Sequence, residues 1–328
     1  MQQKKKSLCS ILLLLLMVAG GAFLYTGNTA PSGSISRQDF KLNTFVKITI
    51  YNSSDETLLD HCMELCDYYE GLFSRTLPTS EIYRLNHGEI NEVSPETAKL
   101  IQTGLEYSRL SGGAFDITIE PVSSLWNFTS GTKKIPSEEE IQKALSLVDY
   151  EKVQVEGNTI TFQETGMGID LGAIAKGYIA DRIKEYLKSK NVRSALINLG
   201  GNVLCLGNKP DGTPFHIGVQ KPFGGSSDIL TTCQISDGSL VSSGTYERCF
   251  QLDGKLYHHI LNPDTGYPYD NGLSAVTIRC ENSVDGDALS TICFALGLEK
   301  GLKLLNTLPQ AEGFLVTEDL KIHYSQNF

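Results

Sequence analysis

The chain has 328 residues, of which 41% are hydrophobic, and its formal net charge is −10. This length allows one large domain or two modest ones, and the apolar content is ample for a full core. The acidic balance argues against a nucleic-acid-binding protein, because phosphate backbones demand a basic face. Charges are dispersed rather than gathered in blocks, so we expect little disorder beyond the N-terminal region.

The N-terminal segment carries a localisation signal. Lys4, Lys5 and Lys6 precede an apolar run at residues 11–24. A basic start followed by an apolar stretch is typical of a signal peptide or a membrane anchor, which we place at residues 1–26. Residues 27–37 are rich in Gly, Ser, Thr and Pro and are expected to form a linker. The folded part, residues 38–328, should then be exported to the outer face of the cytoplasmic membrane, either anchored or cleaved.

The eight cysteines are scattered, without CxxC pairs or metal-ligand spacing. Seven remain when Cys9 of the N-terminal segment is set aside, and an odd number cannot all pair internally. Cys62 and Cys66 lie one helical turn apart on an apolar face, which is typical of buried thiols. We therefore predict mostly free cysteines.

Hydrophobic periodicity predicts an early half rich in helices. A strand at 44–51 is followed by a helix at 57–73 and a polar loop with a helical turn at 73–88. Further helices begin at Ser94-Pro95, ending at Gly112-Gly113, and at Ser137, where Glu140 completes a capping box. The remaining predicted elements of this half are a hairpin of strands at 152–155 and 159–162, and a helix that follows residues 166–174.

The later half reads mainly as strands, predicted at 195–201, 215–220, 229–235, 239–243, 249–252, 256–261 and 273–280. A helix at 285–296, which Gly297 ends or kinks, and a closing hairpin at 312–317 and 320–324 complete the chain. This order favours an α+β architecture over a doubly wound sheet. A GxGxxG fingerprint is absent, so a dinucleotide-binding fold of the Rossmann type is disfavoured.

Residues 166–182, GMGIDLGAIAKGYIADR, carry the strongest single pattern. Asp170 follows a strand-like approach, Gly172 permits close backbone approach, and Lys176 arrives at the start of a helix. Exposed backbone amides with a nearby cation suit a phosphate-bearing ligand. A tightly packed strand-to-helix turn would also favour Gly and Ala, so the pattern alone leaves both interpretations open.

Three other groups of residues could carry chemistry. Asp116 sits between Phe115 and Ile117, where it either caps local backbone amides or binds a ligand. Asp287 and Thr291 share one helical face, with Ser290 beside them, and their oxygens suit Mg²⁺. An Asp at the N-terminus of a helix could instead act as a cap or as a partner of the helix dipole.

The third group is the pair His258 and His259, which precedes an NPDTG turn. A strand delivers one histidine to each side of the sheet, so only one can face a given cleft, where it could act as a general base. Either histidine could also be a strand residue without a role. The stretch SSGTYER, residues 242–248, offers hydroxyls, but without a GxSxG elbow it does not favour a serine hydrolase.

Six stretches occur in the order seen in the ApbE family: GGAFDITIEPVSSLW, IDLGAIAKGYIAD, INLGGN, SSGTYER, HHILNPDTGYP and DGDALSTICFALG. From about Phe40 to its C-terminus the chain resembles this family of FAD:protein FMN transferases, also called flavin transferases. The resemblance implies one large α+β domain, related to the T-fold, with mixed or antiparallel sheets and flanking helices.

The resemblance also implies an activity. FMN would pass from FAD to a Thr (or Ser) hydroxyl of a partner flavoprotein, forming a phosphoester and releasing AMP, with Mg²⁺ bridging the FAD diphosphate. Acceptors of the family are typically membrane subunits of ion-pumping redox complexes that carry a short Ser/Thr-containing motif. Two alternatives are an FAD pyrophosphatase, which would give FMN and AMP, and a non-enzymatic FAD-binding protein of the cell envelope.

The matching positions imply a site. Asp287 and Thr291, with the backbone oxygen of Ala173, would hold the metal, and Ser290 is a weaker ligand because some relatives carry an acid there. His259 is the candidate base, ahead of His258, and Lys176 would add a positive charge at the phosphates. The implied FAD contacts are Leu42, Thr76, Ala114, Phe115, Asp116, Asp170, Lys176 and Leu261. Relatives often carry Met at position 42 and Tyr at position 76, so Thr76 lacks a ring for stacking.

Overall fold

The computed structural model describes residues 33–126, 128, 133–225 and 227–328. The predicted signal or anchor segment, Cys9 and residues 27–32 of the predicted linker lie outside the described residues. Within the described part of the chain, no helix is long and apolar enough to cross a membrane.

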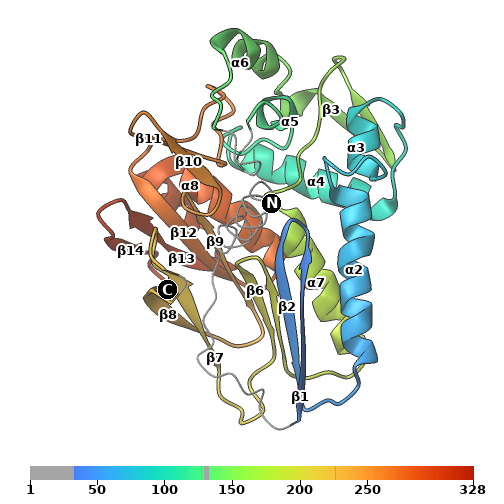
Figure 1. Cartoon of the computed structure of the whole chain (residues 1–328), viewed down its shortest axis with the longest axis vertical. Coiled ribbons are helices and arrows are strands. Elements are labelled where there is room, and N and C mark those ends of the chain that lie inside the picture. The colour runs from blue at the N-terminus through green and yellow to red at the C-terminus, as the bar shows by residue number, and fades with distance from the viewer. Residues whose placement is uncertain (1–32, 127, 129–132, 226) are drawn as a thin grey trace, which may run out of the picture.

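An eight-stranded antiparallel sheet, in the order β1-β2-β5-β6-β9-β12-β13-β14, is the centre of the fold (Figure 1). Its strands are β1 (Ser34–Lys41), β2 (Thr44–Tyr51), β5 (Ala195–Leu199), β6 (Asn202–Leu206), β9 (Ser239–Gly244), β12 (Leu273–Cys280), β13 (Ala311–Thr317) and β14 (Ile322–Tyr324). Three two-stranded hairpins accompany it: β3 (Val153–Glu156) with β4 (Thr159–Phe162), β7 (Phe215–Gln220) with β8 (Ile229–Ile235), and β10 (Cys249–Leu252) with β11 (Lys255–His258). Both the α+β class and the antiparallel pairing agree with the sequence-based expectation.

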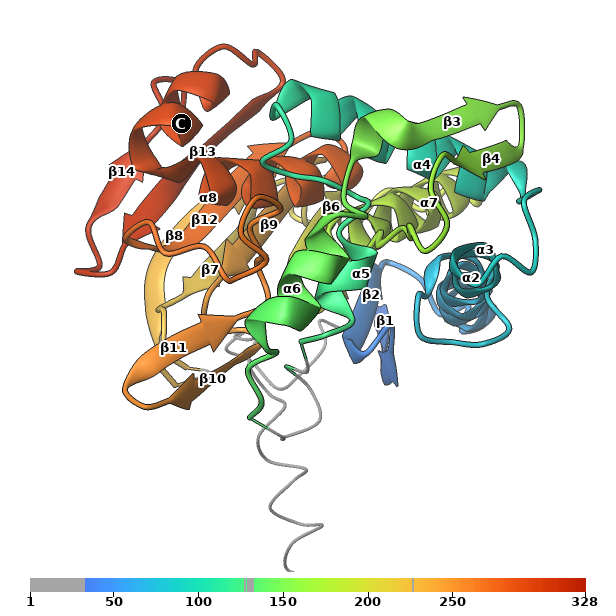
Figure 2. The same ribbon diagram turned by 90° about the horizontal axis from the view of Figure 1, so that it is seen from above.

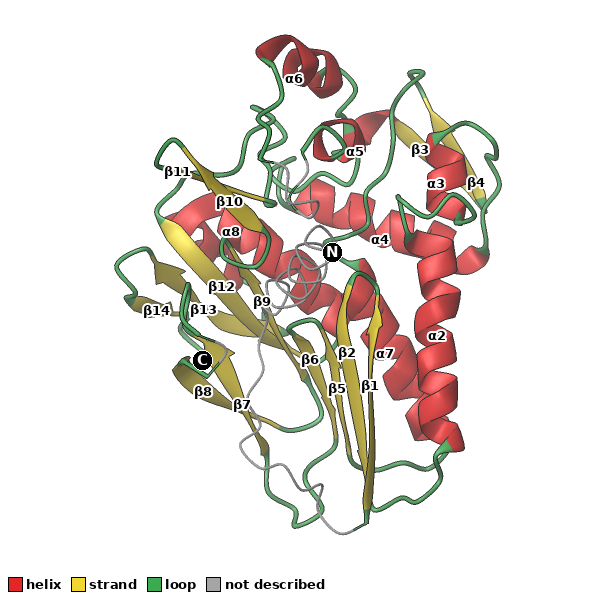
Figure 3. Ribbon diagram, viewed as in Figure 1, coloured by secondary structure: helices red, strands yellow, loops and turns green. Residues whose placement is uncertain are grey.

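Helices cover one face of this sheet, as Figures 2 and 3 show. The helices are α2 (Thr57–Phe73), α3 (Glu81–Asn86), α4 (Pro95–Leu110), α5 (Glu120–Ser123), α6 (Glu138–Leu145), α7 (Ala175–Ser189) and α8 (Ser283–Leu305). The inner side chains of α2 and α7 pack with those of β2 and β5 in the largest core cluster. On the opposite face, Phe215 and Val219 of the β7–β8 hairpin pack with Phe314 of β13, so the middle of the main sheet is covered on both faces.

Local sequence signals set several boundaries as expected. The Ser94 side chain caps α4, and Ser137 and Glu140 form the predicted capping box of α6. Gly297 interrupts α8 with a φ of 76°, a conformation that glycine adopts without strain. The seven described cysteines are free, as predicted, and all but Cys249 are buried.

The sequence-based expectations differ from the structure at two places. Residues 34–37, expected to belong to the linker, begin β1 and pair with residues 48–51 of β2. Their polar side chains suit an edge strand whose outer face meets solvent, so composition alone concealed the strand. The strand and glycine turn predicted at 195–201 are confirmed as β5 and the Gly200-Gly201 turn, but the strand β6 that follows the turn and pairs with β5 was not predicted.

Helices α7 and α8 cross in close contact at Gly177. A Cβ at this position would overlap the carbonyl oxygen of Ser283, at the start of α8. The missing side chain therefore lets the two helix backbones approach each other, and this approach brings α8 against the first turn of α7.

Gly177→Ala should therefore destabilise the protein by about 1–3 kcal/mol, since the added methyl group must push the two backbones apart. Gly71→Ala is the matched control, because Gly71 is also helical but a Cβ there would meet no atom within 4 Å. That control should gain about 0.5–1 kcal/mol from better helix propensity. Urea unfolding of both variants checks the pair, and equal stabilities would contradict the proposed close approach.

Candidate functional site

Asp287 is a buried carboxylate at the crossing of α7, α8 and β6. Its side chain accepts a hydrogen bond from the backbone amide of Gly177 at 2.6 Å and another from Nδ2 of Asn202 at 2.9 Å. The residue is 4% exposed, and burial raises its pKa, while the charge of Lys176 and the two hydrogen bonds oppose that shift. The structure thus holds an acid in the core and surrounds it with donors that favour its ionised form.

The Gly177 bond has a consequence for the start of α7. The N-cap residue of α7 is Ile174, so the Gly177 amide belongs to the first turn, whose amides have no partner within the helix. The first amide to donate within the helix is that of Tyr178, to the Ile174 carbonyl at 3.1 Å. Asp287 accepts from the Gly177 amide and so caps α7, and the partly exposed residue Ala173 lies just before the helix.

The two hydroxyl residues one turn further along α8 differ in their surroundings. Thr291 is partly buried, and its Oγ1 donates only a long bond of 3.4 Å to the Asp287 carbonyl. Ser290 is fully buried, with its Oγ 2.7 Å from Oγ of Ser243 and 3.0 Å from the Asp287 carbonyl. The Ser290 hydroxyl is thus committed to other groups, whereas Thr291 has more freedom to meet a ligand.

The two histidines have separate environments. His258 is 4% exposed; its Nε2 donates to the Tyr269 carbonyl at 2.8 Å, and its Nδ1 accepts from the Ile260 amide at 3.3 Å. Both ring nitrogens are therefore used in holding the 258–269 loop. His259 is only half-buried, and its Nδ1 is a buried atom without a hydrogen-bond partner in the described structure. Of the pair, His259 is the ring whose nitrogen is available.

The pKa of His259 is strongly lowered, to about 3. Burial is the main cause, and the positive charges of Arg248 and Lys176 contribute to the shift. The backbone amide of His259 donates to the carbonyl of Arg248 at 3.1 Å. This bond places His259 next to the last residue of the SSGTYER stretch. The imidazole is therefore neutral at ordinary pH and can accept a proton.

Glu247, next to Arg248, is a second titratable group at this site. Burial raises its pKa to about 7, opposed by the charges of Lys176 and Arg248, while Asp287 adds to the increase. The sequence analysis singled out this stretch for its hydroxyls and did not assign a role to Glu247. Its position between two basic residues and a buried acid was visible only in the folded chain.

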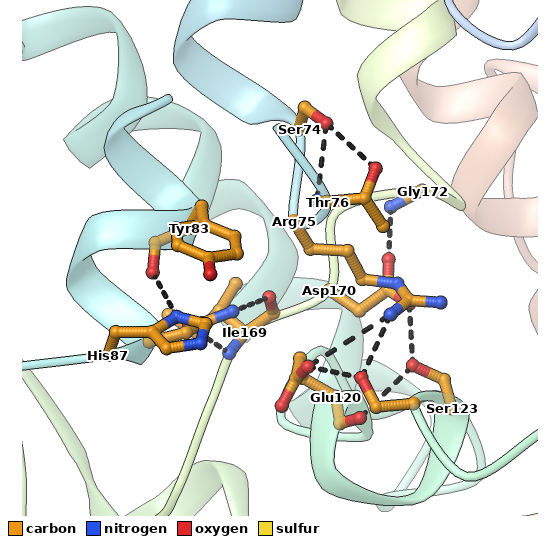
Figure 4. Close-up of polar contacts among 12 residues, drawn as sticks. Ser74, Arg75, Thr76, Tyr83, His87, Glu120, Ser123, Ile169, Asp170 and Gly172 are labelled. Carbon is orange, nitrogen blue, oxygen red and sulfur yellow. Dashed lines mark hydrogen bonds and ion pairs between the residues drawn. The ribbon is translucent and has the colours of Figure 1, made fainter. Parts of the chain in front are cut away.

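Asp170 lies at the turn that leads to α7, where the Arg75 side chain reaches it from the loop that contains Thr76 (Figure 4). Oδ1 of Asp170 accepts from the Gly172 amide at 2.9 Å, and Oδ2 accepts from Oγ of Ser123 at 2.8 Å. Nε of Arg75, the neighbour of Thr76, lies 2.9 Å from the same Oδ2. Two segments that the resemblance assigned to FAD are therefore joined by Arg75, a residue that sequence reasoning missed.

Asp116 serves its own loop. Its Oδ1 accepts from the amide and hydroxyl of Thr118, and its Oδ2 accepts from the amide of Tyr150 at 3.1 Å. These hydrogen bonds match the capping interpretation, and ligand binding by Asp116 stays a prediction. Burial raises its pKa, and these hydrogen bonds oppose the increase.

The remaining predicted contacts are mainly backbone positions. Phe115 and Leu261 are buried in core clusters, so any ligand contact there would come from their main-chain atoms. Ala114 accepts a hydrogen bond from the Tyr269 hydroxyl at 2.8 Å. Leu42 occupies the two-residue β1–β2 turn with a φ of 55°, which is unusual for a leucine. The neighbouring Asn43 accepts a bond from Arg248, so this turn lies beside the Glu247-Arg248 segment.

Comparison with known proteins agrees with this picture. The profile of the ApbE family matches residues 42–315. The chain is 38% identical over 275 residues to the FAD:protein FMN transferase of Klebsiella pneumoniae (strain 342), covering 82% of this chain and 85% of that protein. It is 30% identical to the FAD:protein FMN transferase of Treponema pallidum (strain Nichols) over 321 residues, covering 91% and 89% respectively.

Solved structures show the same relationship. The crystal structure of the ApbE protein from Thermotoga maritima matches with a TM-score of 0.83 at 33% identity, covering 90% of this chain and 98% of that one. The apo flavinyl transferase ApbE of Pseudomonas stutzeri matches with a TM-score of 0.77 at 25% identity, covering 89% and 95%. Sequence and fold therefore agree over most of the chain, which belongs to the ApbE family.

Proposed function

We propose that this protein transfers FMN from FAD to a Thr (or Ser) hydroxyl of a partner flavoprotein and releases AMP, with the help of Mg²⁺. Flavin transfer itself follows from the family, because the curated relatives described above are FAD:protein FMN transferases. The observation that carries the finer proposal is the buried Asp287 carboxylate at the start of α7, which accepts from the Gly177 amide and is influenced by the charge of Lys176, with Ala173 just before the helix.

The oxygen donors fit a hard cation. Carboxylate, backbone carbonyl and hydroxyl oxygens are the protein ligands that Mg²⁺ prefers, and Asp287, Ala173 and Thr291 provide one of each. Among the described residues, no group of three or more His, Cys, Asp or Glu side chains is arranged so that it could hold a metal ion. When bound, Mg²⁺ would neutralise charge on the FAD diphosphate and orient it.

The residues of the chain account for the rest of the reaction. Lys176 would hold the diphosphate as a second positive charge. The acceptor hydroxyl oxygen forms a bond to the FMN phosphorus, the bond between that phosphorus and the bridging oxygen breaks, and AMP leaves with the bridging oxygen. His259 would take the hydroxyl proton, since its ring is neutral and its Nδ1 has no recorded partner among the described residues.

The proton affinity of His259 should depend on whether FAD is bound. Arg248 and Lys176 disfavour a proton on His259. The anionic diphosphate of FAD would offset those charges, raising the proton affinity of the ring when FAD is present. Burial and positive charge therefore keep the base neutral before FAD binds, and substrate charge would make it stronger.

The acceptor and the location belong to this proposal as well. The basic and apolar N-terminal segment supports export with attachment at the outer face of the cytoplasmic membrane, if the segment is retained. A membrane flavoprotein subunit of an ion-pumping redox complex, with a Ser/Thr-containing motif, is the acceptor that we propose.

One assay separates this function from its two alternatives. The protein is incubated with FAD, Mg²⁺ and a candidate acceptor domain, and products are followed by in-gel flavin fluorescence and by AMP release. Fluorescent acceptor supports the transferase, AMP without labelled acceptor indicates an FAD pyrophosphatase, and retained FAD without either product indicates a binding protein.

Asp287→Asn should lower Mg²⁺-dependent transfer by about a hundredfold or more, because a neutral amide cannot balance the cation. Asp285→Asn is the matched control: Asp285 lies in the same helix but pairs with Tyr107 and Asn282. Initial rates across a Mg²⁺ titration, together with the melting temperature of each variant, provide the measurement. Full activity of the Asp287 variant would refute the metal assignment.

His259→Ala should slow transfer by roughly 10²–10⁴-fold while leaving FAD binding intact, because it removes only the base. In the wild type, the low pKa of His259 predicts that kcat/KM for FAD does not fall through its protonation between pH 8 and pH 5. Any inflection near pH 7 should instead disappear in Glu247→Gln, since the pKa of Glu247 is raised to about 7. An inflection near pH 6.5 that vanishes only on replacing His259 would contradict this expectation.

A further inference from the structure

Arg75 joins three segments that approach the candidate site from different parts of the chain. It lies in the loop between α2 and α3, next to Thr76, and its side chain extends toward Asp170 and the short helix α5 (Figure 4). Nε lies 2.9 Å from Oδ2 of Asp170, and Nη1 donates to Oγ of Ser124 at 2.9 Å. Nη1 also lies 4.0 Å from the Glu120 carboxylate, which itself accepts from Ser124.

These contacts are better protected from water than an ordinary surface ion pair. The side chain of Arg75 is 27% exposed, and those of Asp170 and Glu120 are each 19% exposed. Exposed ion pairs contribute little because water screens them and both side chains lose entropy. Here the planar guanidinium meets a carboxylate and a hydroxyl with different nitrogens, a geometry that a lysine ammonium cannot reproduce.

Asp170 transmits this restraint to the site. Its Oδ1 holds the Gly172 amide, and its own amide donates to the Ile117 carbonyl at 2.8 Å. The turn continues directly into Ala173 and Lys176, where the diphosphate and the metal are proposed to bind. A shift of the Asp170 carboxylate would therefore move the turn that presents both groups.

On the other side of Arg75, the bonds that hold the loop stay within it or reach the neighbouring helices. Oγ of Ser74 accepts from the amides of Thr76 and Leu77 at 3.3 and 3.1 Å. The Ser74 carbonyl accepts from the hydroxyl of Ser80, the N-cap residue of α3. The Arg75 contacts are the ones that link this loop to Asp170 and α5.

We propose that Arg75 is a positioning residue that locks the 74–76 loop onto the Asp170 turn and thereby sets the affinity for FAD. This inference rests on the proposed function, since it assigns the loop and the turn to FAD. Arg75 acts through Asp170 in the bound ground state, so its loss raises the Kd and KM for FAD more than it lowers kcat.

The experiment measures FAD binding by calorimetry without acceptor, and KM and kcat for FAD in the transfer assay. Arg75→Ala should bind FAD roughly tenfold to a hundredfold more weakly, as expected when a hydrogen-bonded charged group is lost, with kcat at saturating FAD nearly unchanged. Arg75→Lys should recover only part of the affinity. The matched control is Arg84→Ala, because the Arg84 side chain is 43% exposed and pairs with Glu89, at 3.5 Å, rather than with Asp170.

Ser123→Ala provides a second test that keeps every charge, since it removes only the hydroxyl donor to the same Oδ2 of Asp170. It should weaken FAD binding less than Arg75→Ala, and the effects of the two changes should not add, because both act on one carboxylate. The melting temperature of Arg75→Ala shows whether that variant folds. If it does not fold, the FAD affinity of Ser123→Ala tests the positioning role instead.

The outcomes distinguish this inference from the proposed function. Wild-type FAD affinity in both Arg75→Ala and Ser123→Ala, with transfer intact, overturns the positioning role alone. A fall in kcat with unchanged KM also overturns it, because the residue would then act on the chemical step. If the wild-type protein itself does not bind FAD, the proposed function fails, and this inference fails with it.

Discussion

A buried carboxylate, that of Asp287, is the constraint on which the fold and the site both depend. Removing an ionised carboxylate from water is costly unless hydrogen bonds and opposite charge compensate for it. Here the compensation comes from the Gly177 amide on α7, the Asn202 side chain on β6 and the charge of Lys176. Each donor reaches Asp287 only if its own helix or strand is correctly placed. The crossing of α7 and α8, the position of β6 and the candidate metal site therefore depend on one another.

The same interaction satisfies the N-terminus of α7. The first amides of a helix have no partner within it, and the Asp287 carboxylate accepts from the one at Gly177. A negative charge at this end of the helix is also favoured by the helix dipole. Gly177 makes the arrangement possible, since any side chain there would overlap the backbone of α8.

The two adjacent histidines, His258 and His259, differ in what their ring nitrogens contact. His258 uses both ring nitrogens to hold the loop, whereas His259 has a nitrogen without a partner among the described residues. Lys176 and Arg248 surround this second ring with positive charge, and Glu247 lies nearby with a raised pKa. Two cations beside groups whose pKa values are shifted from their usual range suit an anionic substrate such as FAD.

The sequence by itself determined the elements and the chemical class of the site. Apolar periodicity located α2, β2 and β12, and caps located α4 and α6. The spacing of Asp287 and Thr291 placed two candidate oxygen ligands on one helical face. These features depend on neighbours within a few residues, which is why the sequence reveals them. The polar edge strand at the start of β1 escaped because its pairing partner, not its composition, makes it a strand.

Only the tertiary structure decided which side chains compensate the buried charge and which hold the turn in place. The bonds from Gly177 and Asn202 to Asp287 span 110 and 85 residues of sequence, and Arg75 reaches Asp170 from another helix–helix loop. No local pattern encodes such pairs, because they exist only once the helices have packed on the sheet. Desolvation, which raises the pKa values of Asp287 and Glu247 and lowers that of His259, likewise arises only from that packing.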